Sequence, residues 1–134
     1  MTALTLEFAV PPADVNTVHH LLEEVWSDAP LISARERFRF ETALIELASN
    51  VIRHADGGDG LECVLTVEVT EDSLRALLID SGVEGHIDFT RGMPSEDEES
   101  GRGIPLIQAL VDRLEYSRDG GRNRWEIQRI ITAE

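Results

Sequence analysis

Two side chains near the middle of the sequence, Glu46 and Asn50, are spaced so that they could act on one small molecule. The apolar residues around them recur at helical spacing, and residues four apart on a helix lie one turn apart on the same side. A carboxamide oxygen can coordinate a hard cation, and a carboxylate beside it can accept a proton. On an isolated helix such a pair is more often simply solvated, so the pair alone leaves both interpretations open.

Two glycine-containing segments further along the chain could bind other parts of a ligand. Asp80 ends an alternating apolar run, where its carboxylate could accept a hydrogen bond from an amino group on a base, and Gly82 would permit close backbone approach. Gly101, Arg102 and Gly103 lie directly before a predicted helix, so the arginine and the free backbone N–H groups at the start of that helix could bind an anion. Taken alone, an ordinary turn explains the first segment, and a flexible hinge explains the second.

The apolar periodicity predicts the strands and helices that must position these segments. Alternation indicates strands, spacings of three and four indicate helices, and caps and turn residues mark the ends. In chain order we expect a strand at Leu4–Val10, a helix from the N-cap Asp14 to residues 27–30, a longer helix from the capping box of Ser33 and Glu36 to about Ala55, strands at Leu61–Thr70 and Ser73–Asp80, a helix at Ile104–Asp112 and a hairpin of Leu114–Ser117 and Arg124–Ile131. The polar segment Ser81–Ser100 is too long for an ordinary turn and indicates a functional loop.

Length and composition limit the class of protein. The chain has 134 residues, 42% of them hydrophobic, which allows one compact domain over residues 1–134. A formal net charge of −14 without a basic stripe argues against binding to nucleic acid. No signal-like start or long apolar run is present, so we expect a cytoplasmic protein without a membrane segment. The single cysteine, Cys63, lies in an apolar strand and is expected to be buried.

The order of the three chemical segments resembles the GHKL ATPase superfamily over nearly the whole chain. Its N, G1 and G2 boxes correspond in order to Glu46-x-x-x-Asn50, Asp80-x-Gly82 and Gly101-x-Gly103. Residues 46–55 and 101–112 look most like the RsbW and SpoIIAB anti-sigma-factor kinases. The resemblance implies a two-layer α/β sandwich of the Bergerat type, with a mixed, mainly antiparallel sheet and helices over one face. No P-loop or Rossmann glycine pattern competes with it.

The resemblance also implies a role for each box. Asn50 would coordinate a Mg²⁺ that bridges the phosphates of ATP, and Glu46 would act as general base toward the attacking hydroxyl. Asp80 would recognise the amino group of adenine, and Gly82 would let the base approach. The residues that would embrace the phosphates are Gly101, Arg102 and Gly103. The loop from about residue 83 to residue 100 would be a lid over the nucleotide.

The implied activity is that of a protein serine/threonine kinase dependent on ATP and Mg²⁺. Its implied partners are an anti-anti-sigma factor of the STAS-domain class, which it would phosphorylate, and a sigma factor, which it would sequester; a homodimer is implied as well. One departure is that relatives commonly show Asp-x-Gly-x-Gly, whereas the second glycine here, Gly85, comes one residue late. The alternatives are an ATP-responsive regulatory binding module without kinase activity and an interaction domain that binds no nucleotide.

Overall fold

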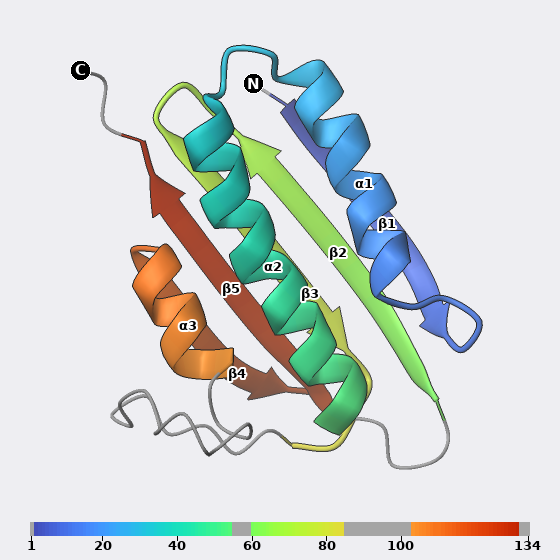
Figure 1. Ribbon diagram of the computed structural model, residues 1–134. Coiled ribbons are helices and arrows are strands. Elements are labelled where there is room, and N and C mark those ends of the chain that lie inside the picture. The colour runs from blue at the N-terminus through green and yellow to red at the C-terminus, as the bar shows by residue number, and fades with distance from the viewer. Residues whose placement is uncertain (1, 55–59, 85–102, 132–134) are drawn as a thin grey trace, which may run out of the picture.

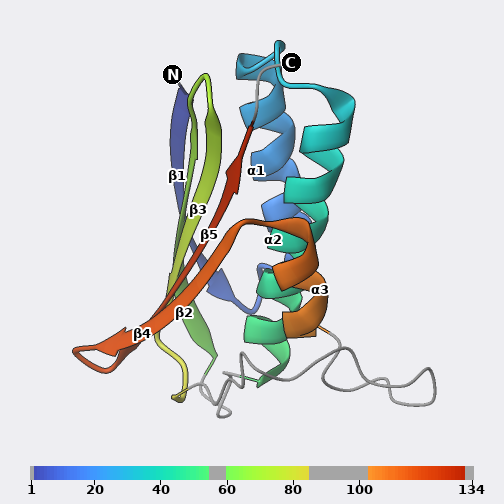
Figure 2. The same ribbon diagram turned by 90° about the vertical axis from the view of Figure 1, so that its left-hand side faces the viewer.

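The computed structural model describes residues 2–54, 60–84 and 103–131, which form two layers. One layer is a five-stranded sheet, and Figure 2 shows that the helices all cover the same face of it. In chain order (Figure 1), the elements are β1 (Thr2–Val10), α1 (Val15–Asp28), α2 (Ala34–His54), β2 (Leu61–Val69), β3 (Ser73–Asp80), α3 (Gly103–Leu110), β4 (Arg113–Asp119) and β5 (Arg122–Ile130). The predicted α/β sandwich with helices over one face is confirmed.

The strands lie in the order β1-β2-β3-β5-β4, and all four neighbouring pairs are antiparallel. β3 is therefore the central strand, between β2 and β5. At its end, Asp80 lies opposite Cys63 on one side and Asn123 on the other. Because side chains alternate across a strand, these three paired residues point to the same face, which is the face that the helices cover.

The element ends follow from local hydrogen bonds. The Asp14 side chain caps α1 by accepting from the N–H of Asn16 at 2.9 Å. The last helix ends at Leu110, two residues before the predicted end, because Asp112 already belongs to the sheet edge: its N–H donates to the carbonyl of Gln128 at 2.9 Å. The hairpin is correspondingly longer than predicted.

The N-terminus of α2 forms only half of the predicted capping box. The Ser33 hydroxyl accepts a hydrogen bond from the N–H of Glu36 at 3.2 Å, as a capping residue should. The Glu36 carboxylate does not turn back to Ser33. It binds Arg129 near the end of β5, with Nε to Oε2 at 2.9 Å, and this ion pair ties the start of α2 to the sheet.

Apolar side chains from both layers form one core. In α2, Leu44 and Leu47 are fully buried, and they belong to the same core as the buried leucines Leu65 of β2 and Leu78 of β3. Burying one such side chain contributes about 1.5–3 kcal/mol. α2 packs between α1 and α3 over the sheet. This packing fixes the end of α2 relative to the end of β3.

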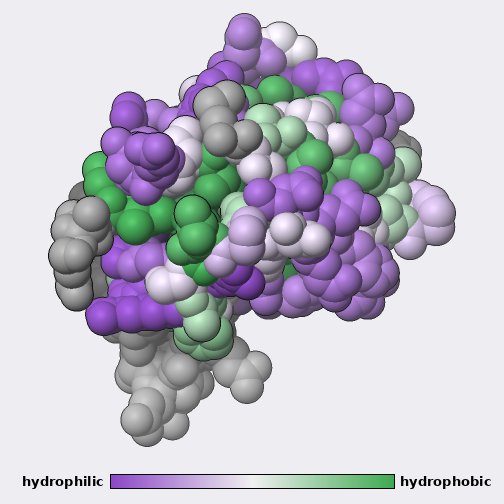
Figure 3. Space-filling view, turned by 90° about the horizontal axis from the view of Figure 1, so that it is seen from above, coloured by the Kyte–Doolittle hydropathy of each residue, from purple (hydrophilic) through white to green (hydrophobic). Residues whose placement is uncertain are grey.

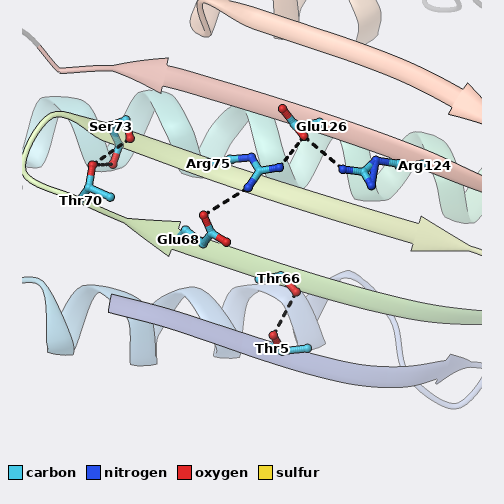
Figure 4. Close-up of polar contacts among 8 residues, drawn as sticks. All are labelled: Thr5, Thr66, Glu68, Thr70, Ser73, Arg75, Arg124 and Glu126. Carbon is cyan, nitrogen blue, oxygen red and sulfur yellow. Dashed lines mark hydrogen bonds and ion pairs between the residues drawn. The ribbon is translucent and has the colours of Figure 1, made fainter. Parts of the chain in front are cut away.

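The other face of the sheet carries no helix among the described residues, and it combines polar side chains with Val64, Leu77 and Ile79. Figure 4 shows its central network: Arg75 contacts Glu68 at 3.3 Å and Glu126 at 2.8 Å, and Arg124 lies 3.6 Å from Glu126. The hydrogen bond from Arg75 lowers the pKa of the Glu126 carboxyl. Partly exposed pairs of this kind contribute little stability one by one.

The end of the molecule that carries the α1–α2 connection exposes some large apolar residues. Leu31 is 97% exposed and Phe38 is 70% exposed. Figure 3 looks down on this end and shows hydrophobic patches between hydrophilic ones. In the described ranges, no helix has the length and apolar character needed to cross a lipid bilayer.

Replacing Glu36 with Gln should destabilise the fold at neutral pH and should have a smaller effect in acid. The hydrogen bond from Arg129 holds the pKa of the Glu36 carboxyl below its ordinary value of 4.5. The pair therefore stabilises the folded state above the unfolded-state pKa, and this contribution is lost as the pH falls through the lowered folded-state pKa. Urea unfolding midpoints at neutral pH and at about pH 3 measure the difference.

The matched control is Glu71→Gln, at an exposed position in the β2–β3 turn, which should leave both midpoints unchanged. An equal loss of stability at both pH values in Glu36→Gln would show that the ion pair is not responsible.

Candidate functional site

Glu46, the predicted general base, and Asn50, the predicted metal ligand, both lie in the C-terminal half of α2. Glu46 and Asn50 are both half-buried, beside the buried stripe of the helix. The Glu46 carboxylate makes no hydrogen bond or ion pair with any residue in the described ranges. Asn50 is engaged, because its Oδ1 accepts a hydrogen bond from Nη2 of Arg53 at 2.8 Å. The helix thus offers one uncommitted carboxylate and one carboxamide whose oxygen already contacts a cation.

Asp80, the predicted base anchor, is completely buried at the end of β3. Its Oδ1 accepts hydrogen bonds from the N–H of Gly82 at 2.8 Å and from Nδ2 of Asn123 at 2.9 Å. Its Oδ2 accepts from Nε1 of Trp125 at 2.9 Å. A buried carboxylate needs such donors, since an unpaired charge in the interior is strongly penalised. The contact with Gly82 is also that of an Asx turn, so this glycine has a structural role besides the predicted one.

The residues around Asp80 on the hairpin were not predicted from the sequence. Asn123 is also fully buried, and it binds Asp80, the Val83 carbonyl, the Tyr116 hydroxyl and the Arg118 guanidinium. The one available signal is the alternation of β5, which places a polar Asn two residues before Trp on a face that is otherwise apolar. Such a residue needs buried partners, but alternation does not say which strand supplies them.

Burial and the nearby charge of Asp80 both act on Cys63, which faces it across β2 and β3. Burial, the larger cause, raises the pKa of the Cys63 thiol to about 11, and the negative charge of Asp80 adds to the shift. The thiol is therefore protonated and unreactive at neutral pH. This confirms that Cys63 is a buried structural side chain.

The third predicted segment is described only from Gly103 onward. Gly103 is the first residue of α3, whose start lies at the same end of the molecule as the ends of α2 and β3 (Figure 1). Gly101 and Arg102 fall outside the described residues, as do residues 85–100 of the predicted lid. The described parts of the three boxes are thus placed at one end of the fold.

A hollow of about 390 Å³ lies elsewhere, along the β4–β5 hairpin. The residues that line it are Leu114, Glu115, Tyr116, Ser117, Arg124 and Glu126. None of the predicted site residues is among them. The hollow therefore does not mark the predicted site.

The described residues fit magnesium at the Asn50 end of the site. Magnesium commonly takes one or two oxygen ligands from protein and the rest from phosphate and water. The Asn50 oxygen has a second lone pair, although the positive charge of Arg53 must move aside when a divalent cation binds. No group of three His, Cys, Asp or Glu side chains suited to a metal occurs in the described ranges. The cation would therefore depend on the nucleotide for most of its ligands.

At Asp80, a nucleotide base can bind only after the surrounding side chains move. A carboxylate offers about four acceptor positions, and the protein occupies three of them at Asp80. One position on Oδ2 remains for an amino group. Because Asp80 has no exposed surface, the side chains that cover it must shift before a base can reach that position.

Comparison with known proteins identifies the family. The sequence model of one protein family, described as the histidine kinase-like ATPase domain, matches residues 8–128. A comparison with curated proteins found no match. Because the family model covers most of the sequence, the chain belongs to the histidine kinase-like ATPase domain family. The predicted GHKL membership is thereby confirmed, and it supports ATP binding and kinase-type chemistry.

Two solved structures of histidine kinases share the fold. The histidine kinase domain of the blue-light activated kinase of Erythrobacter litoralis EL346 is 21% identical with a TM-score of 0.52, over 72% of this chain and 45% of that one. The histidine kinase AdeS of Acinetobacter baumannii is 18% identical with a TM-score of 0.51, over 99% of this chain and 70% of that one. The chain thus spans less than half the length of the first structure. At these identities the likeness shows the fold alone.

Replacing Asp80 with Asn should destabilise the protein even without nucleotide. Asparagine has the same shape as aspartate, but an NH₂ group replaces one of the two carboxylate oxygens. Each of these oxygens now accepts from an N–H donor, so at least one buried donor loses its partner. The expected cost is about 1–3 kcal/mol. Urea unfolding followed by tryptophan fluorescence measures it. Asp119→Asn, at the exposed end of β4, is the matched control and should be neutral. An unchanged midpoint in Asp80→Asn would contradict the hydrogen-bonding described above.

Proposed function

We propose that this chain is an ATP-dependent serine/threonine protein kinase that acts as an anti-sigma factor. The observation that carries the proposal is the Glu46 carboxylate, which is half-buried, free of partners among the described residues, and one helical turn from Asn50. A hydroxyl nucleophile must lose its proton during attack on phosphorus, so it benefits from a base at this place. A neutral imidazole nitrogen needs no such base, and this difference favours a serine or threonine acceptor over a histidine.

The proposed roles follow from the donor chemistry of each residue. Glu46 would accept the proton of the acceptor hydroxyl while that oxygen bonds to the γ-phosphorus and ADP departs. Bound Mg-ATP would supply the phosphoryl group, with its charge partly neutralised by the cation. Asn50 would hold the magnesium, and Asp80 would accept from the adenine amino group. The backbone from Gly101 to Gly103 would bind the phosphates through its N–H groups.

We propose the partners from the resemblance of the sequence to anti-sigma-factor kinases. The acceptor would be a STAS-domain anti-anti-sigma factor, and the second partner would be a sigma factor. We propose a cytoplasmic homodimer that contacts neither nucleic acid nor membrane directly. The net charge of −14 supports the first of these exclusions, because it opposes the phosphate backbone.

Two observations favour the alternative of an ATP-responsive binding module without phosphoryl transfer. The Asn50 oxygen already contacts the Arg53 guanidinium. The Asp80 carboxylate has no exposed surface, so the side chains that cover it must shift before a nucleotide base can reach Oδ2. A slow or incomplete rearrangement at either place would leave a domain that senses ATP without using it.

Replacing Glu46 with Gln should abolish transfer while leaving nucleotide binding intact. The change removes the proton acceptor but keeps the size of the side chain, and loss of a general base typically lowers the rate by about 10²–10⁴-fold. Partners are first co-purified from host cells and identified by mass spectrometry. The recovered STAS-domain protein is then incubated with the chain and ATP labelled on the γ-phosphate, and its phosphorylation is followed over time.

The matched control is Glu24→Gln on the exposed side of α1, which should transfer as the unmodified chain does. Unchanged labelling in Glu46→Gln would remove Glu46 from the mechanism. Binding of ATP by the unmodified chain without any labelling of the STAS protein would favour the binding module.

A further inference from the structure

Asn123 uses every hydrogen-bonding position of its side chain inside the protein. Its Nδ2 donates to Oδ1 of Asp80 at 2.9 Å and to the carbonyl of Val83 at 2.7 Å. Its Oδ1 accepts from the hydroxyl of Tyr116 and from Nη1 of Arg118, the latter at 2.9 Å. A carboxamide has two donors and two acceptor lone pairs, so no position is left over. The residue is also fully buried.

These partners permit only one orientation of the amide. If the group were turned over, its oxygen would face the Asp80 carboxylate and the Val83 carbonyl, which are both acceptors. Its NH₂ group would then face the Arg118 guanidinium, which can only donate. Arg118 at one end of the amide, and the acceptors Asp80 and Val83 at the other, therefore all favour the orientation in which the donor end of Asn123 faces Asp80.

Arg118 also ties the backbone beside Asp80 to the hairpin. Its Nη1 donates to the carbonyl of Gly82 at 3.2 Å, and its Nη2 donates to the carbonyl of Gly121 in the β4–β5 turn at 3.4 Å. Gly82 in turn donates its N–H to Asp80. Arg118, Asn123 and the Asp80–Gly82 turn form one closed set of hydrogen bonds.

This set determines which oxygen of Asp80 remains available. Oδ1 already accepts two hydrogen bonds, from Gly82 and Asn123, whereas Oδ2 accepts one, from the Trp125 indole. The remaining acceptor position therefore lies on Oδ2, beside that indole. A ligand group that reaches it must be a hydrogen-bond donor, such as the amino group of adenine.

We propose that Asn123, oriented by Arg118, is a positioning residue that holds the Asp80 carboxylate with Oδ2 presented to the base. It thereby makes the site selective for a base that carries an amino group over one that carries an oxo group. This inference rests on the proposed binding of ATP at Asp80. It adds the β4–β5 hairpin to the elements that determine base selectivity.

The test compares ATP with inosine triphosphate, which has an oxo group in place of the adenine amino group. Dissociation constants for both are measured by calorimetry with Mg²⁺ for the unmodified chain, Asn123→Leu and Arg118→Met. In each variant, ATP should bind about tenfold more weakly, while inosine triphosphate should change by less than about twofold. A purely structural role would weaken both nucleotides alike. Arg118 is exposed, so Arg118→Met keeps the test usable if Asn123→Leu does not fold.

The matched control is Arg124→Met, on the same hairpin but in the network on the other face of the sheet, which should change neither constant. Hydrogen exchange by NMR provides a second measurement without nucleotide. The N–H of Gly82 and the indole N–H of Trp125 should exchange faster in Arg118→Met than in Arg124→Met.

The outcomes separate the two proposals. If the unmodified chain binds neither nucleotide, the proposed function fails, and the exchange rates still decide whether Asn123 and Arg118 position Asp80. If ATP binds and the ratio of the two constants is the same in all variants, the positioning role is overturned. Equal exchange in Arg118→Met and Arg124→Met overturns it as well.

Discussion

The buried carboxylate of Asp80 is the constraint on which the candidate site depends. A charge with no exposed surface must be paired or hydrogen-bonded, and here the donors come from the turn after β3 and from two side chains of β5. Each donor fixes a piece of backbone relative to the carboxylate. The end of the central strand, residues 82–83 after it and the C-terminal hairpin are therefore held together as one unit.

The two carboxylates of the candidate site differ in a way that matches their proposed roles. Asp80 is fixed by several donors, as a group that recognises a ligand by position should be. Glu46 has no hydrogen-bond or ion-pair partner in the described ranges and is half-exposed, so its carboxylate oxygens are not engaged in a structural bond. Asn50 lies between these extremes, because in the described ranges its side chain has one hydrogen bond, with the exposed Arg53 near the end of α2. The fold thus places the proposed recognition residue on the sheet and the proposed general base on the helix.

The packing of the two layers is what brings these groups to one end of the molecule. The core stripe of α2 lies on the inner face of the sheet, with α1 and α3 on either side. The ion pair of Glu36 with Arg129 holds the opposite end of the helix to β5. Because a helix is rigid, fixing its first turn and its apolar stripe also fixes its last turns. The position of Glu46 and Asn50 relative to Asp80 is a consequence of this packing.

The sequence by itself determined the elements and the residues that can do chemistry. The spacing of apolar residues and the capping residues predicted the order of strands and helices, because both signals depend on residues only a few positions apart. The predicted bounds of β3 agree with the observed ones. The motif order predicted the family. Only the tertiary structure decided that Asn123 contacts Asp80 and that Arg118 contacts Asn123. The pairing of β3 with β5 brings together residues more than forty positions apart, and neither period nor local propensity contains that register.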